Sequence, residues 1–189
     1  MPIYLISNVH RSGSSMMMRC LTSAGMNGAF DEEINDRLSL FFDSTYHPNP
    51  NGFYQLLKTP NEFTVSEYQN KVLKFPFRRL IHLPQGDYKI CFLKRNPLEI
   101  EASMQKFTPF RSWGNDSVVL EFYDLITNSI ISNLQQRTDV NLTVLNYADI
   151  VTNPTNEFNK LFTNGWPIDV NIAASLVDDS LHRFKLETT

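Results

Sequence analysis

The stretch "LISNVHRSGSSMMMRCL" (residues 5–21) runs from apolar residues through a short polar loop into a helical pattern. Gly13 can adopt backbone conformations that other residues avoid. Ser12, Ser14 and Ser15 bring hydroxyl and backbone N–H groups to the start of the helix, where unpaired N–H groups and the helix dipole attract anions. The loop therefore predicts an anion site. The structural alternative is that the serines only cap the helix.

The same loop departs from the phosphate-binding loop of nucleotide triphosphatases, G-x-x-x-x-G-K-[ST]. If Gly13 is the second glycine of that pattern, Asn8 stands in the place of the first glycine and Ser14 in the place of the lysine. Only Ser15 matches, and Arg11 supplies a cation two residues before the glycine instead. If this chain were an ordinary kinase or ATPase, it would lack the lysine that neutralises the phosphates in such enzymes. A small nucleotide or metabolite kinase stays open as an alternative.

The composition limits the class of protein. The 189 residues, 42% of them apolar, are enough for one substantial core, so we expect a single domain over residues 1–189. The net charge of -3 argues against nucleic acid as a partner, because nucleic-acid-binding surfaces carry an excess of Lys and Arg. Cys20 and Cys91 lie in apolar runs and are expected to be reduced thiols, and no metal site is predicted. No leader-like or membrane-spanning run is visible, so we expect a cytoplasmic protein with no membrane partner.

Short β-rich runs alternate with helical patterns along the chain, which is typical of an α/β fold with helices on both faces of a mostly parallel sheet. The predicted strands are Ile3 to Ser7, Arg79 to Leu83, Lys89 to Lys94 and Leu142 to Asn146. Besides the helix after Gly13, the predicted helices are Pro97 to Phe107 with Asn96 as its N-cap, Asp116 to Gln136, Asn156 to Thr163 and Val170 to Asp178. Residues 30–72 are aromatic and turn-rich and give no clear pattern.

Ligands of open parallel sheets bind beyond the carboxyl ends of the strands, so the residues at those ends are candidates for a site. His82 lies at the end of the second predicted strand and could accept a proton there, since its unperturbed pKa is about 6.5. A structural histidine is the alternative. Arg95 follows the third predicted strand, and Ser103 lies nearly two helical turns beyond Asn96, so Arg95 and Ser103 could share a phosphate. Alone, the pair could equally be a surface arginine and an ordinary helix serine.

Three segments in this order, "HRSGSS" (10–15), "IHLP" (81–84) and "FLKRNPLEIEASMQKF" (92–107), resemble the sulfotransferases that use 3′-phosphoadenosine 5′-phosphosulfate. The first is similar to their 5′-phosphosulfate loop, [KR]-S-G-[ST]-[ST], and the second to the end of their K-T-H-L-P element. The third is similar to their 3′-phosphate motif, in which R-[ND] is followed by six residues and Ser. The segment "VLNYADIVTNP" (144–154) has weaker similarity to a Y-E-D sequence that follows a strand in this family.

The resemblance implies a three-layer α/β/α fold like that of the P-loop NTPases, in a short bacterial-type member of the family. The implied reaction is metal-independent, in-line transfer of a sulfuryl group to a hydroxyl or amine of a small molecule, glycan or peptide. Arg11 and His82 are implied to be catalytic, the arginine by stabilising charge on the leaving phosphate and the histidine by taking the acceptor proton. The residues implied to bind the nucleotide are Arg11, Ser12, Gly13, Ser14, Ser15, Arg95, Ser103 and Tyr147.

The sequence departs from the family pattern in two places. Leu80 replaces the lysine of K-T-H-L-P, and the R-K-G segment that grips the 3′-phosphate in cytosolic animal members is absent, although His182 and Arg183 could take its place. A non-catalytic nucleotide-binding relative is therefore a further alternative. The sequence does not reveal the acceptor or the oligomeric state. A set of aromatic residues could line an acceptor pocket or belong to the core: Phe41, Phe42, Tyr46, Phe53, Tyr54 and Trp113.

Overall fold

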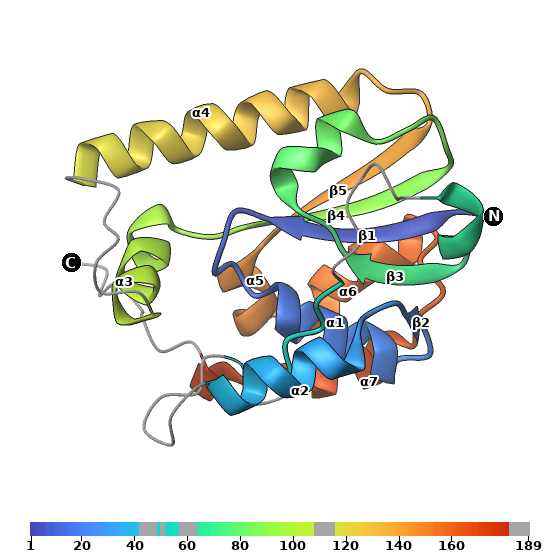
Figure 1. The fold of residues 1–189 in the computed structure, drawn as a ribbon, viewed down its shortest axis with the longest axis horizontal. Coiled ribbons are helices and arrows are strands. Elements are labelled where there is room, and N and C mark those ends of the chain that lie inside the picture. The colour runs from blue at the N-terminus through green and yellow to red at the C-terminus, as the bar shows by residue number, and fades with distance from the viewer. Residues whose placement is uncertain (42–48, 50–51, 57–63, 108–115, 182–189) are drawn as a thin grey trace.

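The computed structural model describes residues 1–41, 49, 52–56, 64–107 and 116–181, which build a five-stranded sheet between two layers of helices (Figure 1). The strand order is β2-β3-β1-β4-β5, and every neighbouring pair is parallel. The strands are β1 (Ile3–Asn8), β2 (Asn27–Gly28), β3 (Lys71–Lys74), β4 (Tyr88–Lys94) and β5 (Val140–Asn146). The predicted α/β fold with a parallel sheet is confirmed.

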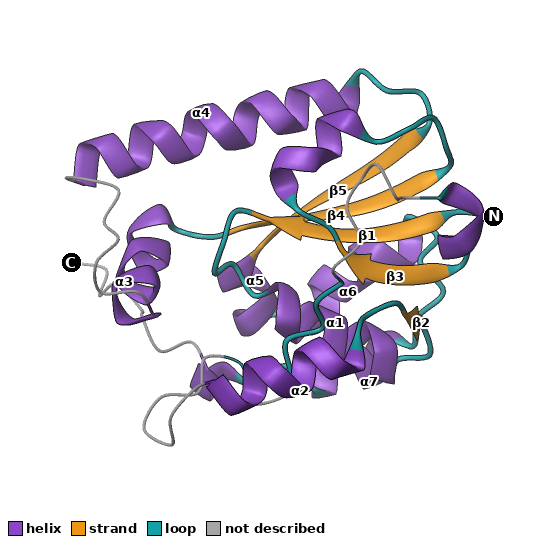
Figure 2. Cartoon of the chain, in the orientation of Figure 1, coloured by secondary structure: helices purple, strands orange, loops and turns teal. Residues whose placement is uncertain are grey.

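The helices lie on both sides of the sheet, with α4 over one face and α1, α5, α6 and α7 over the other (Figure 2). They are α1 (Ser14–Ser23), α2 (Glu32–Phe41), α3 (Pro97–Phe107), α4 (Asp116–Gln135), α5 (Tyr147–Thr152), α6 (Pro154–Thr163) and α7 (Val170–Ser175). Three short 3-10 helices add to them: η2 (Val65–Tyr68), η3 (Phe77–His82) and η4 (Asp179–Leu181). Within the described ranges, no helix has both the length and the apolar character that crossing a lipid bilayer requires.

Two hydrophobic cores form because successive side chains of a strand point to opposite faces of the sheet. On β1, Ile3 and Leu5 pack into the core beneath α4, while Tyr4 and Ile6 pack into the core against α1 and α6. All four side chains are buried. A strand covered on both faces reads as a continuous apolar run, which is why β1 was recognisable in the sequence.

One predicted strand is wrong. Residues 79–83 belong to or directly follow the 3-10 helix η3. Phe77, Leu80 and Leu83 are buried, whereas Ile81 is exposed. An interval of three residues matches the three residues per turn of a 3-10 helix, so these side chains line one side of η3 and fill the core beneath α4. The two leucines of "RRLIHLP" do belong to the core, but with Phe77 they recur every three positions, as in a 3-10 helix, and not every two, as in a strand.

The strand that does precede η3 is β3, which the sequence analysis missed. It is four residues long, and only Val72 and Leu73 are fully buried. Two apolar residues between lysines are too few to reveal a period of two. Helix α5 was missed for a similar reason, because it has only six residues directly after β5. The helix at Pro97 to Phe107 is confirmed, and Asn96 Oδ1 accepts a hydrogen bond from the Leu98 amide, as expected of its N-cap.

The two edges of the sheet differ in their content. At the amino ends of β4 and β5, Arg137 forms an ion pair with Asp139 and donates hydrogen bonds to the carbonyls of Leu83 and Pro84. The amide of Tyr88, the first residue of β4, donates to the Asp139 carbonyl. These contacts hold the end of η3 and its connection to β4 at the amino edge of the sheet. The residues with anion chemistry gather at the carboxyl edge.

Candidate functional site

The loop after β1 is a tight connection that opens α1 toward the carboxyl edge of the sheet. The buried hydroxyl of Ser12 donates to the Val9 carbonyl at 2.7 Å and closes the loop. Arg11 and Gly13 both have left-handed backbones, with φ of 64° and 90°. A Cβ atom on residue 13 would lie 2.6 Å from the ring of Tyr147, so only glycine fits there. The loop is therefore shaped both by its own backbone and by a residue more than 130 positions away.

The first turn of α1 is free of side-chain caps among the described residues. Gly13 is the N-cap and its carbonyl accepts the first helical hydrogen bond from Met17 at 3.0 Å, but no side chain caps the turn. Ser14 begins the helix at partial exposure. The amides of a first helical turn lack partners within the helix, so this end of α1 is available to an anion.

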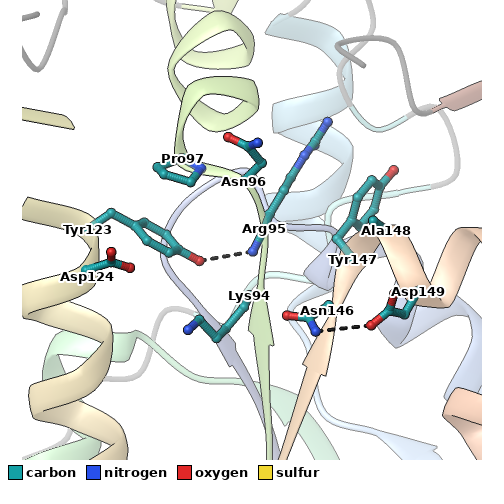
Figure 3. A pocket seen from close by; sticks show the side chains of 10 residues that line it. All are labelled: Lys94, Arg95, Asn96, Pro97, Tyr123, Asp124, Asn146, Tyr147, Ala148 and Asp149. Atoms are coloured by element: carbon teal, nitrogen blue, oxygen red, sulfur yellow. Dashed lines mark hydrogen bonds between the residues drawn. The ribbon is translucent and has the colours of Figure 1, made fainter. Parts of the chain in front are cut away.

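Arg95 lies directly beyond β4 and beside Tyr147 (Figure 3), and several contacts fix its side chain. Its Nε donates to Glu99 Oε2 at 2.8 Å, and its Nη1 donates to the carbonyl of Arg11 at 3.0 Å. The guanidinium carbon lies 4.4 Å from the centre of the Tyr147 ring, a cation–π arrangement. The side chain is only 7% exposed, yet Nη2 has no hydrogen-bond partner in the described part of the chain. Arg95 thus offers one buried, charged donor that none of the described residues satisfies.

Arg11 and Ser103 are in direct contact. The Nε of Arg11 donates to the Ser103 hydroxyl at 3.1 Å, and Ser103 is buried. The family motifs that Arg11 and Ser103 match belong to two different groups of the nucleotide, the 5′-phosphosulfate for Arg11 and the 3′-phosphate for Ser103 with Arg95. The structure brings the residues of both motifs together into one cluster at the same edge.

Lys74 is a member of the cluster that the sequence analysis did not find. It ends β3, and its Nζ donates to the Phe53 carbonyl at 2.7 Å and to the Ser15 hydroxyl at 3.2 Å. Burial lowers the pKa of the Lys74 ammonium to about 7, and the positive charge of Arg11 adds to the shift. Leu80 stands where the family pattern has a lysine, whereas Lys74 brings a lysine to this cluster from the end of β3. Recognising β3 would have found it, because the rule of inspecting strand ends leads directly to Lys74.

Ser15 and Tyr147 also meet at this edge. Ser15, on the first turn of α1, donates its hydroxyl to the Phe53 carbonyl at 3.2 Å. Tyr147 begins α5 directly after β5, and its buried ring packs between Gly13 and Arg95. Burial raises the pKa of the Tyr147 phenol. Tyr147, which the resemblance implies to bind the nucleotide, thus lies beside Gly13 and Arg95, and its role in nucleotide binding stays a prediction.

His82 does not join the cluster. It is the last residue of η3 and is exposed, and the carbonyl of the next residue, Leu83, is bound by Arg137 at the amino ends of β4 and β5. The argument that a strand delivers His82 to the carboxyl edge is therefore wrong, because the residue ends a 3-10 helix that runs toward the opposite edge. The role of proton acceptor has no support from its position.

A pocket of about 330 Å³ opens beside Arg95 (Figure 3). It lies beyond the ends of β4 and β5, where Arg95 and Tyr147 form part of its wall. Asn146 donates to Asp149 at 3.1 Å across one side. The remaining lining residues are Lys94, Asn96, Pro97, Tyr123, Asp124 and Ala148. Among the described residues, no group of three His, Cys, Asp or Glu side chains is arranged to hold a metal ion.

The aromatic residues considered for an acceptor pocket are only partly described. Phe53 is buried, and the ring of Tyr54 packs edge-on against Phe30 with ring centres 5.2 Å apart. The burial of Phe53 and the ring contact of Tyr54 favour the interpretation that these two residues belong to the core. The side chains of Phe41, Phe42, Tyr46 and Trp113 lie outside the described residues, as do His182 and Arg183.

Comparison with solved structures relates this fold to that of the sulfotransferases. The sulfotransferase domain from the curacin biosynthetic pathway aligns with 100% of this chain and 93% of its own, at a TM-score of 0.53 and 16% identity. A more distant likeness is to retinol dehydratase in complex with androsterone and inactive cofactor PAP, with a TM-score of 0.47 and 12% identity over 92% of this chain and 62% of that chain. Another is to an unliganded sugar kinase from Janibacter sp. HTCC2649, with a TM-score of 0.41 and 12% identity over 94% of this chain and 98% of that chain. No protein-family model and no curated protein matches the sequence. The predicted sulfotransferase-like fold is confirmed. At a sequence identity this low, the likeness concerns the fold alone.

Proposed function

We propose that this protein binds 3′-phosphoadenosine 5′-phosphosulfate and transfers its sulfuryl group to a hydroxyl or amine of an acceptor. The observation that carries the proposal is the buried guanidinium of Arg95, whose Nη2 has no partner among the described residues while the group lies against Tyr147 and the loop of Arg11. A buried charged donor without a partner is costly unless a ligand completes it. A phosphate oxygen suits a guanidinium especially well.

Two groups of residues fit the two charged ends of this nucleotide. The first turn of α1, with Arg11 and Lys74 beside it, suits the 5′-phosphosulfate because backbone amides, the helix dipole and two cations converge there. Arg95 and Ser103 suit the 3′-phosphate. Arg11 donates to Ser103 in the structure, so we expect Arg11 to exchange this hydroxyl for the anion when the nucleotide binds.

The nucleotide, when bound, supplies an activated sulfuryl group. The side chains of Arg11 and Lys74 would hold the negative charge at that end, and Tyr147 would keep Arg95 and Gly13 in place. The proposal assigns no role to His82, which lies toward the opposite edge of the sheet. A small-molecule kinase is less well supported, because Ser14 stands where its phosphate-neutralising lysine is required.

A thermal-shift panel tests the nucleotide assignment with ATP, ATP plus Mg²⁺, adenosine 3′,5′-bisphosphate and sulfate. A ligand at 100 times its Kd stabilises the folded state by about 2.7 kcal/mol, which for a chain of this length raises the Tm by about 5–11 °C. We expect this rise with the bisphosphate and none with ATP, with or without Mg²⁺. Equal or larger stabilisation by ATP with Mg²⁺ would refute the assignment in favour of a kinase.

Labelled donor and a broad acceptor library then separate an enzyme from a non-catalytic binder. Transfer of the label to an acceptor is the expected result. The Arg95→Gln variant serves as the binding-deficient control, and Arg37→Gln, on the exposed surface of α2, serves as the matched arginine control. Bisphosphate binding without any label transfer would leave the protein as a binder and overturn the transferase proposal.

A further inference from the structure

Lys74 has unusual surroundings for a lysine. Its Nζ hydrogen-bonds to two neutral groups, the Phe53 carbonyl and the Ser15 hydroxyl, and no ion pair to a carboxylate is found for it among the described residues. A lysine held away from water normally requires an anionic partner to remain charged. The position thus disfavours the ammonium form as long as no negative charge is nearby.

Within the described part of the chain, the elements around Lys74 contribute no negative charge that would stabilise its ammonium form. The loop after β1 contributes Arg11, whose positive charge opposes protonation of the lysine. Helix α1 contributes the Ser15 hydroxyl, residues 52–56 contribute the Phe53 carbonyl, and β1 pairs with β3 through Ile6. Together with desolvation, Arg11 brings the pKa of Lys74 to about 7. At neutral pH the side chain is therefore shared between its charged and uncharged forms.

Ser15 is the second residue of α1, so Lys74 reaches the very turn whose amides are available to an anion. We infer that an anion seated on this turn brings a proton with it to Lys74, so that binding at the site is coupled to proton uptake. The proton comes from solvent and bonds to the amine nitrogen; no other bond changes. The identity of the anion rests on the proposed function, whereas the coupling needs only a doubly charged anion at this turn.

Calorimetry at pH 8.0 in two buffers of different ionisation enthalpy tests the coupling with adenosine 3′,5′-bisphosphate. At that pH the phosphates are already fully ionised, since their second pKa is about 6, so the ligand itself exchanges no proton. We expect the wild type to take up about 0.9 proton per ligand. Between pH 7 and pH 8 its affinity should fall about fivefold, because the fraction of protein with a charged lysine falls from about one half to about one tenth.

Lys74→Arg is the matched variant, because a guanidinium keeps its charge at any of these pH values. It should bind the bisphosphate with no proton uptake and without the fivefold loss of affinity. Binding of the bisphosphate to the wild type without proton uptake would overturn the inference and leave the proposed function intact. Equal uptake by Lys74→Arg would overturn it as well, because another group would then be the proton acceptor.

Absence of any bisphosphate binding would instead refute the proposed function. The coupling is then tested with sulfate, which stays a dianion throughout, by NMR of protein labelled with ¹³C at the lysine ε-carbons. The resonance that disappears in Lys74→Arg belongs to Lys74. Its titration midpoint should rise by more than one pH unit at high sulfate concentration, and a midpoint that does not move overturns the inference.

Discussion

Replacing Arg95 by methionine should separate what this residue does for the fold from what it does for a ligand. The side chains of Arg95 and Glu99 are 7% and 11% exposed, and their ion pair spans one turn of α3 and its N-cap region. Removing one member of a buried pair leaves the other charge poorly compensated and costs about 3 kcal/mol. For a chain of this length that corresponds to a Tm lower by about 6–12 °C.

The loss of affinity follows from the unpaired nitrogen. If Nη2 of Arg95 binds a phosphate oxygen, the variant loses one charge-assisted hydrogen bond, worth about 1.5–3 kcal/mol. The Kd for adenosine 3′,5′-bisphosphate should therefore rise about 10- to 150-fold. Isothermal calorimetry measures the Kd, and urea denaturation of the same samples measures the free energy of unfolding.

A double variant keeps the two effects apart. Replacing both Arg95 and Glu99 by methionine removes the whole buried pair, which is often neutral for stability, so most of the lost stability should return. The affinity should stay low, because the donor to the phosphate is still absent. Arg37→Met is the surface control, and breaking its exposed ion pair should change stability by less than about 1 kcal/mol. Wild-type affinity in the double variant would refute the assignment of Arg95 to the phosphate.

Three further outcomes follow from the geometry. His82→Gln should leave turnover of labelled donor within about twofold of wild type, and a fall near the 10²-fold that a general base typically contributes would restore its catalytic role. Gly13→Ala should lower the Tm in thermal denaturation more than Gly25→Ala, because both positions have positive φ but only residue 13 meets the Tyr147 ring, and equal losses would contradict this. Asp139, whose pKa its arginine partner lowers to about 2, should stabilise the fold above its unfolded pKa of 3.8 and lose that effect as pH falls through 2. Urea titrations of Asp139→Asn should therefore differ from wild type at pH 7 and converge toward it near pH 2, and a constant difference would refute the shift.

The elements that the sequence predicted well are those whose local pattern is long enough to be unambiguous. Strands β1 and β4 each contain four consecutive apolar residues, 3–6 and 90–93, and α3 has an N-cap and a proline at its start. Strand β3 has two buried residues, and η3 repeats its apolar residues every three positions rather than every two. Short elements carry too little periodicity to be told apart, and the misplacement of His82 followed directly from that.

Some candidate residues could be proposed from the sequence because their chemistry is local. Arg11, Gly13 and the neighbouring serines belong to one loop. Arg95 directly precedes α3 and Ser103 lies within it, so in both cases residues near each other in the sequence are also near in space. Lys74 could not be found this way, because its contacts to Ser15 and Phe53 join segments 59 and 21 residues apart.

The sequence by itself determined the strand, the glycine-containing loop and the helix that predict an anion site at the carboxyl edge of a parallel sheet, because backbone amides and residue conformations are local properties. The tertiary structure decided which cations lie beside that loop. Parallel strands that are distant along the chain end side by side, so Lys74 of β3 and Arg95 after β4 come to flank the loop after β1. The tertiary structure also decided the protonation state of Lys74, because burial and the nearby positive charge of Arg11 lower its pKa.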